Sequence, residues 1–321
     1  MEFVAHRFEF RCCVRGSLLL NEHKGAALRG VFNEAVREYC DRRDLTSCHP
    51  CPLLSCCPAA HLVSPVEESG RRGPDVPRPY AIQPPLEPLR LYGDGAPFAF
   101  GITLYGRGIQ QLRTVLGGLR ARGQLSLGRR ASQDSGFFGR GALQLEEVLA
   151  RNPEDGREAV VMRSDDQFAR LPDFGVTHEA VLRRAEAMGR PDRLTIQFLT
   201  PTRLIEQGRL VQRPLFRPLF QRLVERLSSL WEQYAGASPP LDFAALMAAA
   251  EKVRTVDDAT RWVELESYSA RRNVRTPIGG FVGRATFEGP LAPLLPWLIW
   301  GEYTHVGKNA VKGDGWYRLE G

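Results

Sequence analysis

The segment Gly301-Glu-Tyr-Thr-His-Val-Gly-Lys-Asn-Ala-Val-Lys-Gly-Asp-Gly-Trp-Tyr317 combines glycine, histidine and lysine in one loop. Its glycines permit positive φ angles and a close approach of the backbone to a ligand. Exposed N–H groups in such a loop can bind phosphate oxygens. Two of the four lysines of the chain, Lys308 and Lys312, lie here, shortly after His305. The composition predicts a phosphodiester-binding loop, and a plain glycine-rich turn before a last strand is the alternative.

The residues before this loop predict the elements of one folding unit, taken as residues 191–321. Residues 194–199 alternate apolar side chains, which is typical of a strand, and residues 218–234 place them at helical spacing. We further expect strands at 263–268, 281–287 and 316–319, and helices at 243–253 and 291–302. Without the short helix at 243–253 this order is βαββαβ, the ferredoxin-like arrangement.

The first 190 residues predict a second unit of the same kind. A strand is expected at 3–20, and a helix begins at Gly25 with an apolar face at spacings of three and four. Residues 64–97 are rich in proline and must run extended over a surface. A strand at 98–105, a helix at 109–119 and strands across 123–145 complete the unit. Because 321 residues exceed one usual core, we expect an α+β fold of two tandem ferredoxin-like (RRM-like) domains.

Cysteines are concentrated in a segment at about 40–61, inserted in the first domain. Five of the seven follow the order Cys-x7-Cys-x2-Cys-x4-Cys-Cys, which is more typical of a metal knuckle than of a disulfide framework. Four thiolates can hold one tetrahedral zinc ion. The expected ligands are Cys40, Cys48, Cys51 and Cys57, with Cys56, His49 or His61 as substitutes. A loop with free thiols and an iron–sulfur cluster stay open as alternatives.

The composition excludes several classes of protein. With 43% hydrophobic and 25% charged residues, it is that of a folded soluble protein. No apolar run approaches the roughly 20 residues that span a bilayer. Glu2, His6 and Arg7 stand where a signal peptide needs an apolar core. We therefore expect a cytoplasmic protein without a membrane partner.

Positive charge is unevenly distributed along the chain, whose formal net charge is +6. Residues 107–140 contain seven arginines and one acid, and residues 183–226 contain ten arginines and four acids. Such concentrated charge suits a polyanionic partner, because neutralised phosphates release their counterions. An arginine-rich composition spread over solvated faces is the alternative.

Taken together, these features resemble the CRISPR-associated precursor-RNA-processing endoribonucleases of the RAMP superfamily. The resemblance runs nearly end to end and depends on the order and spacing of several short motifs. They are Gly25-Ala-Ala-Leu-Arg-Gly30, Cys48-His-Pro-Cys51, Arg78-Pro-Tyr80, Leu199-Thr-Pro-Thr-Arg203, Gly279-Gly-Phe-Val-Gly283 and the C-terminal loop. In that loop Gly307 to Gly315 corresponds to the glycine-rich loop of the superfamily, with its final Gly-x-Gly at Gly313-Asp-Gly315.

The resemblance implies a metal-independent endoribonuclease that cleaves CRISPR precursor RNA within its repeats. The ribose 2′-OH attacks the adjacent phosphate and leaves a 2′,3′-cyclic phosphate and a 5′-OH. This chemistry needs a base, an acid and cations for the developing charge, and no cofactor. The implied partners are CRISPR repeat RNA, the mature crRNA that the enzyme can retain, and subunits of a CRISPR effector complex. Monomer and homodimer both stay open.

Two histidines are the candidates for proton transfer in that reaction. His305 lies in the glycine-rich loop and is placed slightly ahead of His23, which stands before the first predicted helix. Both would face the cleft between the two domains. Tyr303 is expected to orient the 2′-OH, and Lys308 to stabilise charge. The expected RNA-binding residues are Lys24, Arg129, Arg130, Arg271, Arg272, Arg275, Arg284, Gly307, Lys312, Gly313 and Gly315.

Two other classes of function compete with this interpretation. A non-catalytic crRNA-binding subunit of an effector complex needs a basic surface but no proton donor, so the loop with His305 and its lysines favours the enzyme. A zinc-knuckle DNA-binding regulator would need a recognition helix with base-reading side chains, and no such helix lies beside the cysteines.

Overall fold

The computed structural model describes residues 2–40, 42, 48, 51–54, 57–63, 65, 76–127, 141–269 and 274–320. The chain divides into two compact units. The N-terminal unit is Val4–Gly175, and the C-terminal unit combines Met1–Phe3 with Val176–Gly321. The sequence predicts this boundary at 190–191, but the helix α4 (His178–Ala187) contacts the helix α7 (Leu295–Thr304) and so belongs to the C-terminal unit.

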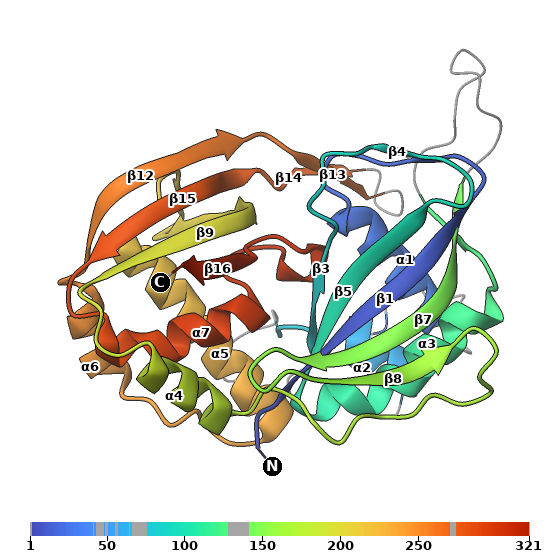
Figure 1. Cartoon of the computed structure of the whole chain (residues 1–321), viewed down its shortest axis with the longest axis horizontal. Coiled ribbons are helices and arrows are strands. Elements are labelled where there is room, and N and C mark those ends of the chain that lie inside the picture. Colours follow the sequence, from blue (N-terminus) through green and yellow to red (C-terminus); the bar gives the residue numbers. More distant parts are fainter. Residues whose placement is uncertain are drawn as a thin grey trace. The chain divides into compact units, whose positions relative to one another are not determined.

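The N-terminal unit has the element order βαββαβ (Figure 1). Its second strand, Tyr80–Gln83, lies in the proline-rich segment that was expected to run over a surface, but it is buried because it pairs with the strand Pro97–Tyr105 in the sheet. These elements are β1 (Ala5–Arg15), α1 (Gly25–Arg37), β3 (Tyr80–Gln83), β5 (Pro97–Tyr105), α3 (Leu112–Ala121) and β7 (Ala142–Asn152). The antiparallel strand order is β3-β5-β1-β7, as in a ferredoxin-like sheet. Additions are β2 (Leu18–Leu19), α2 (Pro58–Val63), β4 (Leu91–Tyr92), a 3-10 turn (Gly106–Gln111), β6 (Leu125–Ser126) and β8 (Arg157–Arg163).

Apolar residues at alternating and helical spacing build the core of this unit. Phe8 and Phe10 of β1 are buried, and the ring of Phe10 stacks on that of Phe100 in β5 at 4.9 Å. Helix α1 packs on α3 so closely that a Cβ at Gly118 would lie 2.0 Å from the carbonyl oxygen of Ala35. Only glycine therefore fits at this helix crossing.

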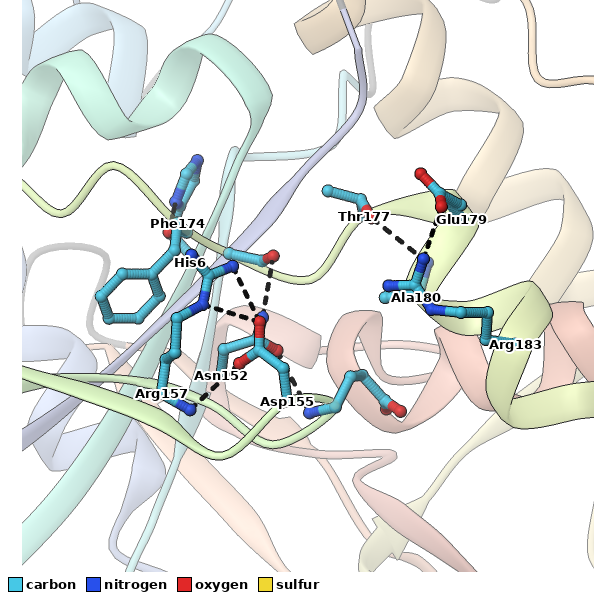
Figure 2. Close-up of polar contacts among 11 residues, drawn as sticks. His6, Asn152, Asp155, Arg157, Phe174, Thr177, Glu179, Ala180 and Arg183 are labelled. Atoms are coloured by element: carbon cyan, nitrogen blue, oxygen red, sulfur yellow. Dashed lines mark hydrogen bonds and ion pairs between the residues drawn. The ribbon is translucent and has the colours of Figure 1, made fainter. Parts of the chain in front are cut away.

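The end of the N-terminal unit is held against its own sheet (Figure 2). The amide of Asn152 donates to the carbonyl of Gly175 at 3.1 Å, and Nδ1 of His6 lies 3.0 Å from the carbonyl of Phe174. The guanidinium of Arg157 lies 5.0 Å from the centre of the Phe174 ring. His6 thus has a structural role, because its ring nitrogen binds a carbonyl oxygen.

The C-terminal unit repeats the βαββαβ order with its own antiparallel sheet (Figure 1). The elements are β9 (Arg193–Thr202), α5 (Phe216–Ala235), β12 (Arg254–Val263), β15 (Gly280–Glu288), α7 and β16 (Tyr317–Glu320), and the strand order is β12-β15-β9-β16. Two hairpins add to it, β10 (Leu204–Glu206) with β11 (Arg209–Val211) and β13 (Glu266–Ser269) with β14 (Val274–Pro277). The other additions are α4, α6 (Phe243–Ala250) and two 3-10 turns (Ala292–Leu294 and Ala310–Lys312). Helices α5 and α7 pack together against one face of the sheet.

Several element boundaries differ from the prediction. The strand expected at 263–268 is replaced by β12, which starts at Arg254, and by β13. Strand β12 is a largely exposed edge, so its sequence lacks the apolar alternation that marks a half-buried strand. Pro296 falls in the first turn of α7, where a missing N–H costs nothing, rather than within a helix that it would kink. Within the described part of the chain, no helix is long and apolar enough to cross a membrane.

Candidate functional site

The glycine-rich loop connects α7 to β16 and turns through left-handed backbone. Gly307 has φ 80° and Gly315 has φ 70°. A Cβ at Gly315 would lie 1.8 Å from the carbonyl oxygen of Val306, and one at Gly307 would lie 2.4 Å from that of Arg203. His305 also has a positive φ, 60°, which costs a residue with a side chain about 1–3 kcal/mol. The loop conformation therefore requires glycine and is held by strong packing.

The amides of this loop hydrogen-bond inside the C-terminal unit. The N–H of Lys308 donates to the carbonyl of Arg203 at 3.0 Å, and that of Gly315 donates to Pro201 at 3.0 Å. The N–H groups of Val306, Lys312, Gly313 and Asp314 donate to carbonyls within the loop. These six N–H groups are therefore not available to phosphate oxygens, contrary to the expectation of exposed amides. Their role is to fix the loop on the end of β9.

His305 and Tyr303 are both buried in this unit. The exposed fraction of His305 is 0%, and its ring lies parallel to that of Trp316 at 6.0 Å. Nδ1 of His305 is 3.2 Å from the carbonyl oxygen of Asp314, which only accepts, so this nitrogen donates. The ring of Tyr303 meets Trp300 edge-on at 6.2 Å. Of the predicted residues in this loop, Lys308 is exposed and Lys312 is half-buried.

Sequence reasoning missed three residues that hold the loop and its helix. The carbonyl of Arg203 accepts from the N–H of Lys308 in the loop, and its guanidinium donates to the carbonyl of Gly279 at 3.0 Å. The hydroxyl of Thr200 accepts from the N–H of Trp316 at 2.9 Å, and Arg226 donates to the carbonyl of Thr304 at 2.8 Å. Arg203 and Thr200 fall in the quoted motif at 199–203, so a signal for them was present in the sequence.

His23 and Lys24 lie between β2 and α1 in the N-terminal unit. His23 is half-buried, whereas the exposed fraction of Lys24 is 0%. The Lys24 ammonium donates to the carbonyl of Glu87 at 2.6 Å. Burial lowers the pKa of Lys24, and the carboxylates of Glu87 and Glu22 partly oppose that shift. The structure thus leaves His23 partly exposed as a residue, with its Nε2 buried, and leaves Lys24 without exposed surface.

The arginines predicted to bind RNA divide into two groups. Arg275 pairs with Glu266 at 3.3 Å and Arg284 with Glu320 at 3.0 Å, and both guanidinium groups are exposed. Exposed ion pairs contribute about 1 kcal/mol or less, so both guanidinium groups can exchange their partner for a phosphate. Arg129, Arg130, Arg271 and Arg272 lie outside the described residues.

The four predicted metal ligands are half-buried free cysteines. The N–H of Cys51 donates to the carbonyl of Cys48 at 3.0 Å, which closes a tight turn between two of the thiols. Burial raises the pKa of the Cys48 thiol, and the neighbouring thiols of Cys40, Cys57 and Cys51 add to the rise, while Arg37 opposes it. Among the described residues, no three His, Cys, Asp or Glu side chains are grouped as ligands of one metal ion. Two of the substitute ligands, Cys56 and His49, lie outside those residues.

Comparison with family models relates both units to known proteins. Residues 3–173 match the model described as AF_1859_N, N-terminal domain. Residues 196–317 match that of the CRISPR-associated endoribonuclease Cas6, and this range includes β9, α7 and the glycine-rich loop. Over these C-terminal residues the chain is similar to the Cas6 family of CRISPR-associated endoribonucleases. The Cas6 match therefore covers the glycine-rich loop between α7 and β16.

Solved Cas6 structures share the fold of the whole chain. A Cas6 product complex is 17% identical, with a TM-score of 0.59 over 98% of this chain and 100% of that one. Thermus thermophilus Cas6 is 14% identical, with a TM-score of 0.55 and 100% coverage of both chains. A chain of a partial Cas6-RT-Cas1–Cas2 complex is 14% identical, with a TM-score of 0.60 over 99% of this chain and 46% of that one. A search of curated proteins found no match.

Proposed function

We propose that this protein is a Cas6-type endoribonuclease that cleaves CRISPR precursor RNA within its repeats without a metal ion, by attack of a ribose 2′-OH on the adjacent phosphate. The products are a 2′,3′-cyclic phosphate and a 5′-OH. The observation that carries the proposal is the match of residues 196–317 to the Cas6 endoribonuclease model, which covers the loop with Lys308 and Lys312. Cations beside a phosphodiester stabilise the negative charge that develops during such a transesterification.

Exposure favours His23 over His305 as the residue that transfers a proton. An imidazole titrates near neutrality and can act as acid or base, but it must reach the RNA. His23 is half-buried as a residue, although its Nε2 is buried, whereas His305 is fully buried and its Nδ1 binds the carbonyl of Asp314. We therefore assign proton transfer to His23 and charge stabilisation to the exposed Lys308. His305 and Tyr303 then act by supporting the loop from within.

The test is cleavage of a 5′-labelled CRISPR-repeat RNA in excess EDTA, beside an RNA with a single 2′-deoxy sugar at the mapped cut. We expect cleavage in EDTA, a cyclic phosphate end and no cleavage of the deoxy substrate. His23→Ala should lose roughly 100-fold or more in single-turnover rate, in the range of general acid–base catalysis. Lys252→Met, at an exposed lysine to which no role is assigned, is the control. Cleavage of the deoxy substrate, or a requirement for a divalent metal ion, would refute the mechanism.

We also propose CRISPR repeat RNA, the product crRNA and other CRISPR proteins as the partners. Solved Cas6 structures include a product complex and a Cas6-RT-Cas1–Cas2 complex. The exposed Arg275, Arg284 and Lys308 carry the positive charge that backbone phosphates need. Tight binding of repeat RNA without cleavage would support the alternative, a non-catalytic crRNA-binding subunit. Absence of binding at low salt would refute both.

A structural zinc ion at Cys40, Cys48, Cys51 and Cys57 is a separate proposal, and it has no part in catalysis. Cys40 follows α1, Cys57 directly precedes α2, and these helices are in contact, so an ion would tie their ends together. We expect one zinc ion per chain by elemental analysis, lost in Cys48→Ser and kept in Cys13→Ser, a control in β1. A wild-type protein that melts at the same temperature with and without zinc would refute this.

A further inference from the structure

The turn that carries His23 runs beside a second segment of the N-terminal unit. Strands β2 and β4 pair antiparallel, with Leu18 opposite Tyr92. The pairing continues past β2, because the N–H of Leu20 donates to the carbonyl of Arg90 at 2.8 Å. We call residues 86–92 the strap. Chain direction therefore brings residues 20–24 alongside the strap.

Lys24 connects this turn to the strap through a buried charge. Its carbonyl accepts from the N–H groups of Ala27 and Leu28 at 3.0 and 3.1 Å, so its backbone begins α1. Its ammonium reaches the carbonyl of Glu87 at 2.6 Å and has no exposed surface. A buried ammonium is costly unless it is hydrogen-bonded, so the contact constrains both ends of the side chain.

The strap is in turn fixed to the sheet. The hydroxyl of Tyr92 donates to the carboxylate of Glu87 at 2.6 Å. The buried ring of Tyr92 meets Phe98 edge-on at 5.1 Å, and Phe98 is in contact with Phe100 at 6.4 Å between ring centres. Phe100 stacks on Phe10 of the central strand β1. A continuous series of contacts therefore joins the core of the sheet to the residue that follows His23.

We propose that Lys24 is a positioning residue for His23, which it holds in place by binding the strap through the carbonyl of Glu87. This inference rests on the proposed function, in which His23 transfers a proton. It replaces the sequence-based expectation that Lys24 contacts RNA, because a buried ammonium that already donates to a carbonyl is not presented to a phosphate. Catalytic groups must be held closely, and a displacement of about 1 Å can cost about 100-fold in rate.

The test compares Lys24→Met, which keeps the aliphatic chain and removes the donor, with Lys252→Met. Lys252 is exposed, so that variant removes the same charge at a site without this contact. We expect Lys24→Met to lower the single-turnover rate at saturating RNA by roughly 10- to 100-fold. The RNA concentration for half-maximal rate, and the salt dependence of binding, should not change. Lys24→Arg, which restores a donor, should recover part of the rate, and Lys252→Met should behave as wild type.

A weaker affinity would overturn the proposal. If Lys24 contacted a phosphate, its loss would reduce the slope of log binding constant against log salt by about 0.7–0.9. Should Lys24→Met fold poorly, Tyr92→Phe removes the hydrogen bond at the other end of the strap and should lower the same rate by a smaller factor. An unchanged rate in Tyr92→Phe, with Lys24→Met unfolded, would count against the strap.

Hydrogen exchange separates this proposal from the assignment of His23. Lys24→Met should speed amide exchange in residues 18–24 and in the strap, without RNA present, and leave β7 unchanged. If His23→Ala keeps full activity, the assignment of His23 fails, whereas the exchange result still reports the link between turn and strap. Unchanged exchange in both segments would refute the link itself.

Discussion

Gly315→Ala adds one methyl group to the loop that connects α7 to β16. The new Cβ would lie 1.8 Å from the carbonyl oxygen of Val306, at a backbone φ of 70°. The left-handed conformation costs an alanine about 1–2 kcal/mol. Overpacking adds about 1–3 kcal/mol. The N–H of Val306 donates to the carbonyl of Gly315 at 3.0 Å. The Val306 carbonyl therefore cannot move away from the new Cβ without straining this hydrogen bond.

The expected loss of stability is therefore about 2–5 kcal/mol, which corresponds to a drop in melting temperature of roughly 4–20 °C for a domain of this size. The assay is thermal melting followed by circular dichroism. Gly208→Ala is the matched control, because Gly208 has φ 78° and a Cβ added there would meet nothing within 4 Å. It should lose only about 1–2 kcal/mol. Equal losses in the two variants would refute the packing argument.

Three further predictions concern other parts of the chain. Burial lowers the pKa of His6 and of His178 below 6.5, so as the pH falls these histidines bind protons in the unfolded chain at a higher pH than in the folded chain. Stability should be full above about pH 6.5 and fall below it towards the folded-state pKa values, and a flat melting temperature from pH 7.5 to 5.5 would contradict this. Arg284→Ala should weaken RNA binding, measured by titration at several salt concentrations. The slope of log binding constant against log salt should fall by about 0.7–0.9 for the lost phosphate contact. Gly118→Val should separate α1 from α3 and lower the melting temperature, because a Cβ would lie 2.0 Å from the carbonyl oxygen of Ala35. An unchanged melting temperature would contradict the close packing of α1 on α3.

Local sequence periodicity predicted most of the core helices and strands, but it missed β3 and α4. Apolar residues recur every second position in β9 and every third or fourth in α5, and burial follows that spacing. The periodic signal is absent where a strand is exposed on both faces. Strand β12 has charged residues through its length, and its edge position in the sheet explains why it was not predicted at its true start.

The amino-acid order alone was enough to predict two tandem ferredoxin-like units, the place of the glycine-rich loop and the resemblance to CRISPR-processing endoribonucleases, but not the buried strand β3. Which polar side chains meet solvent depended instead on how the segments pack. His305 and Lys24 are buried by contacts with Trp316 and with the carbonyl of Glu87, the latter 63 positions along the chain. Periodicity describes one element at a time, whereas the burial of a histidine or lysine depends on the segment packed over it.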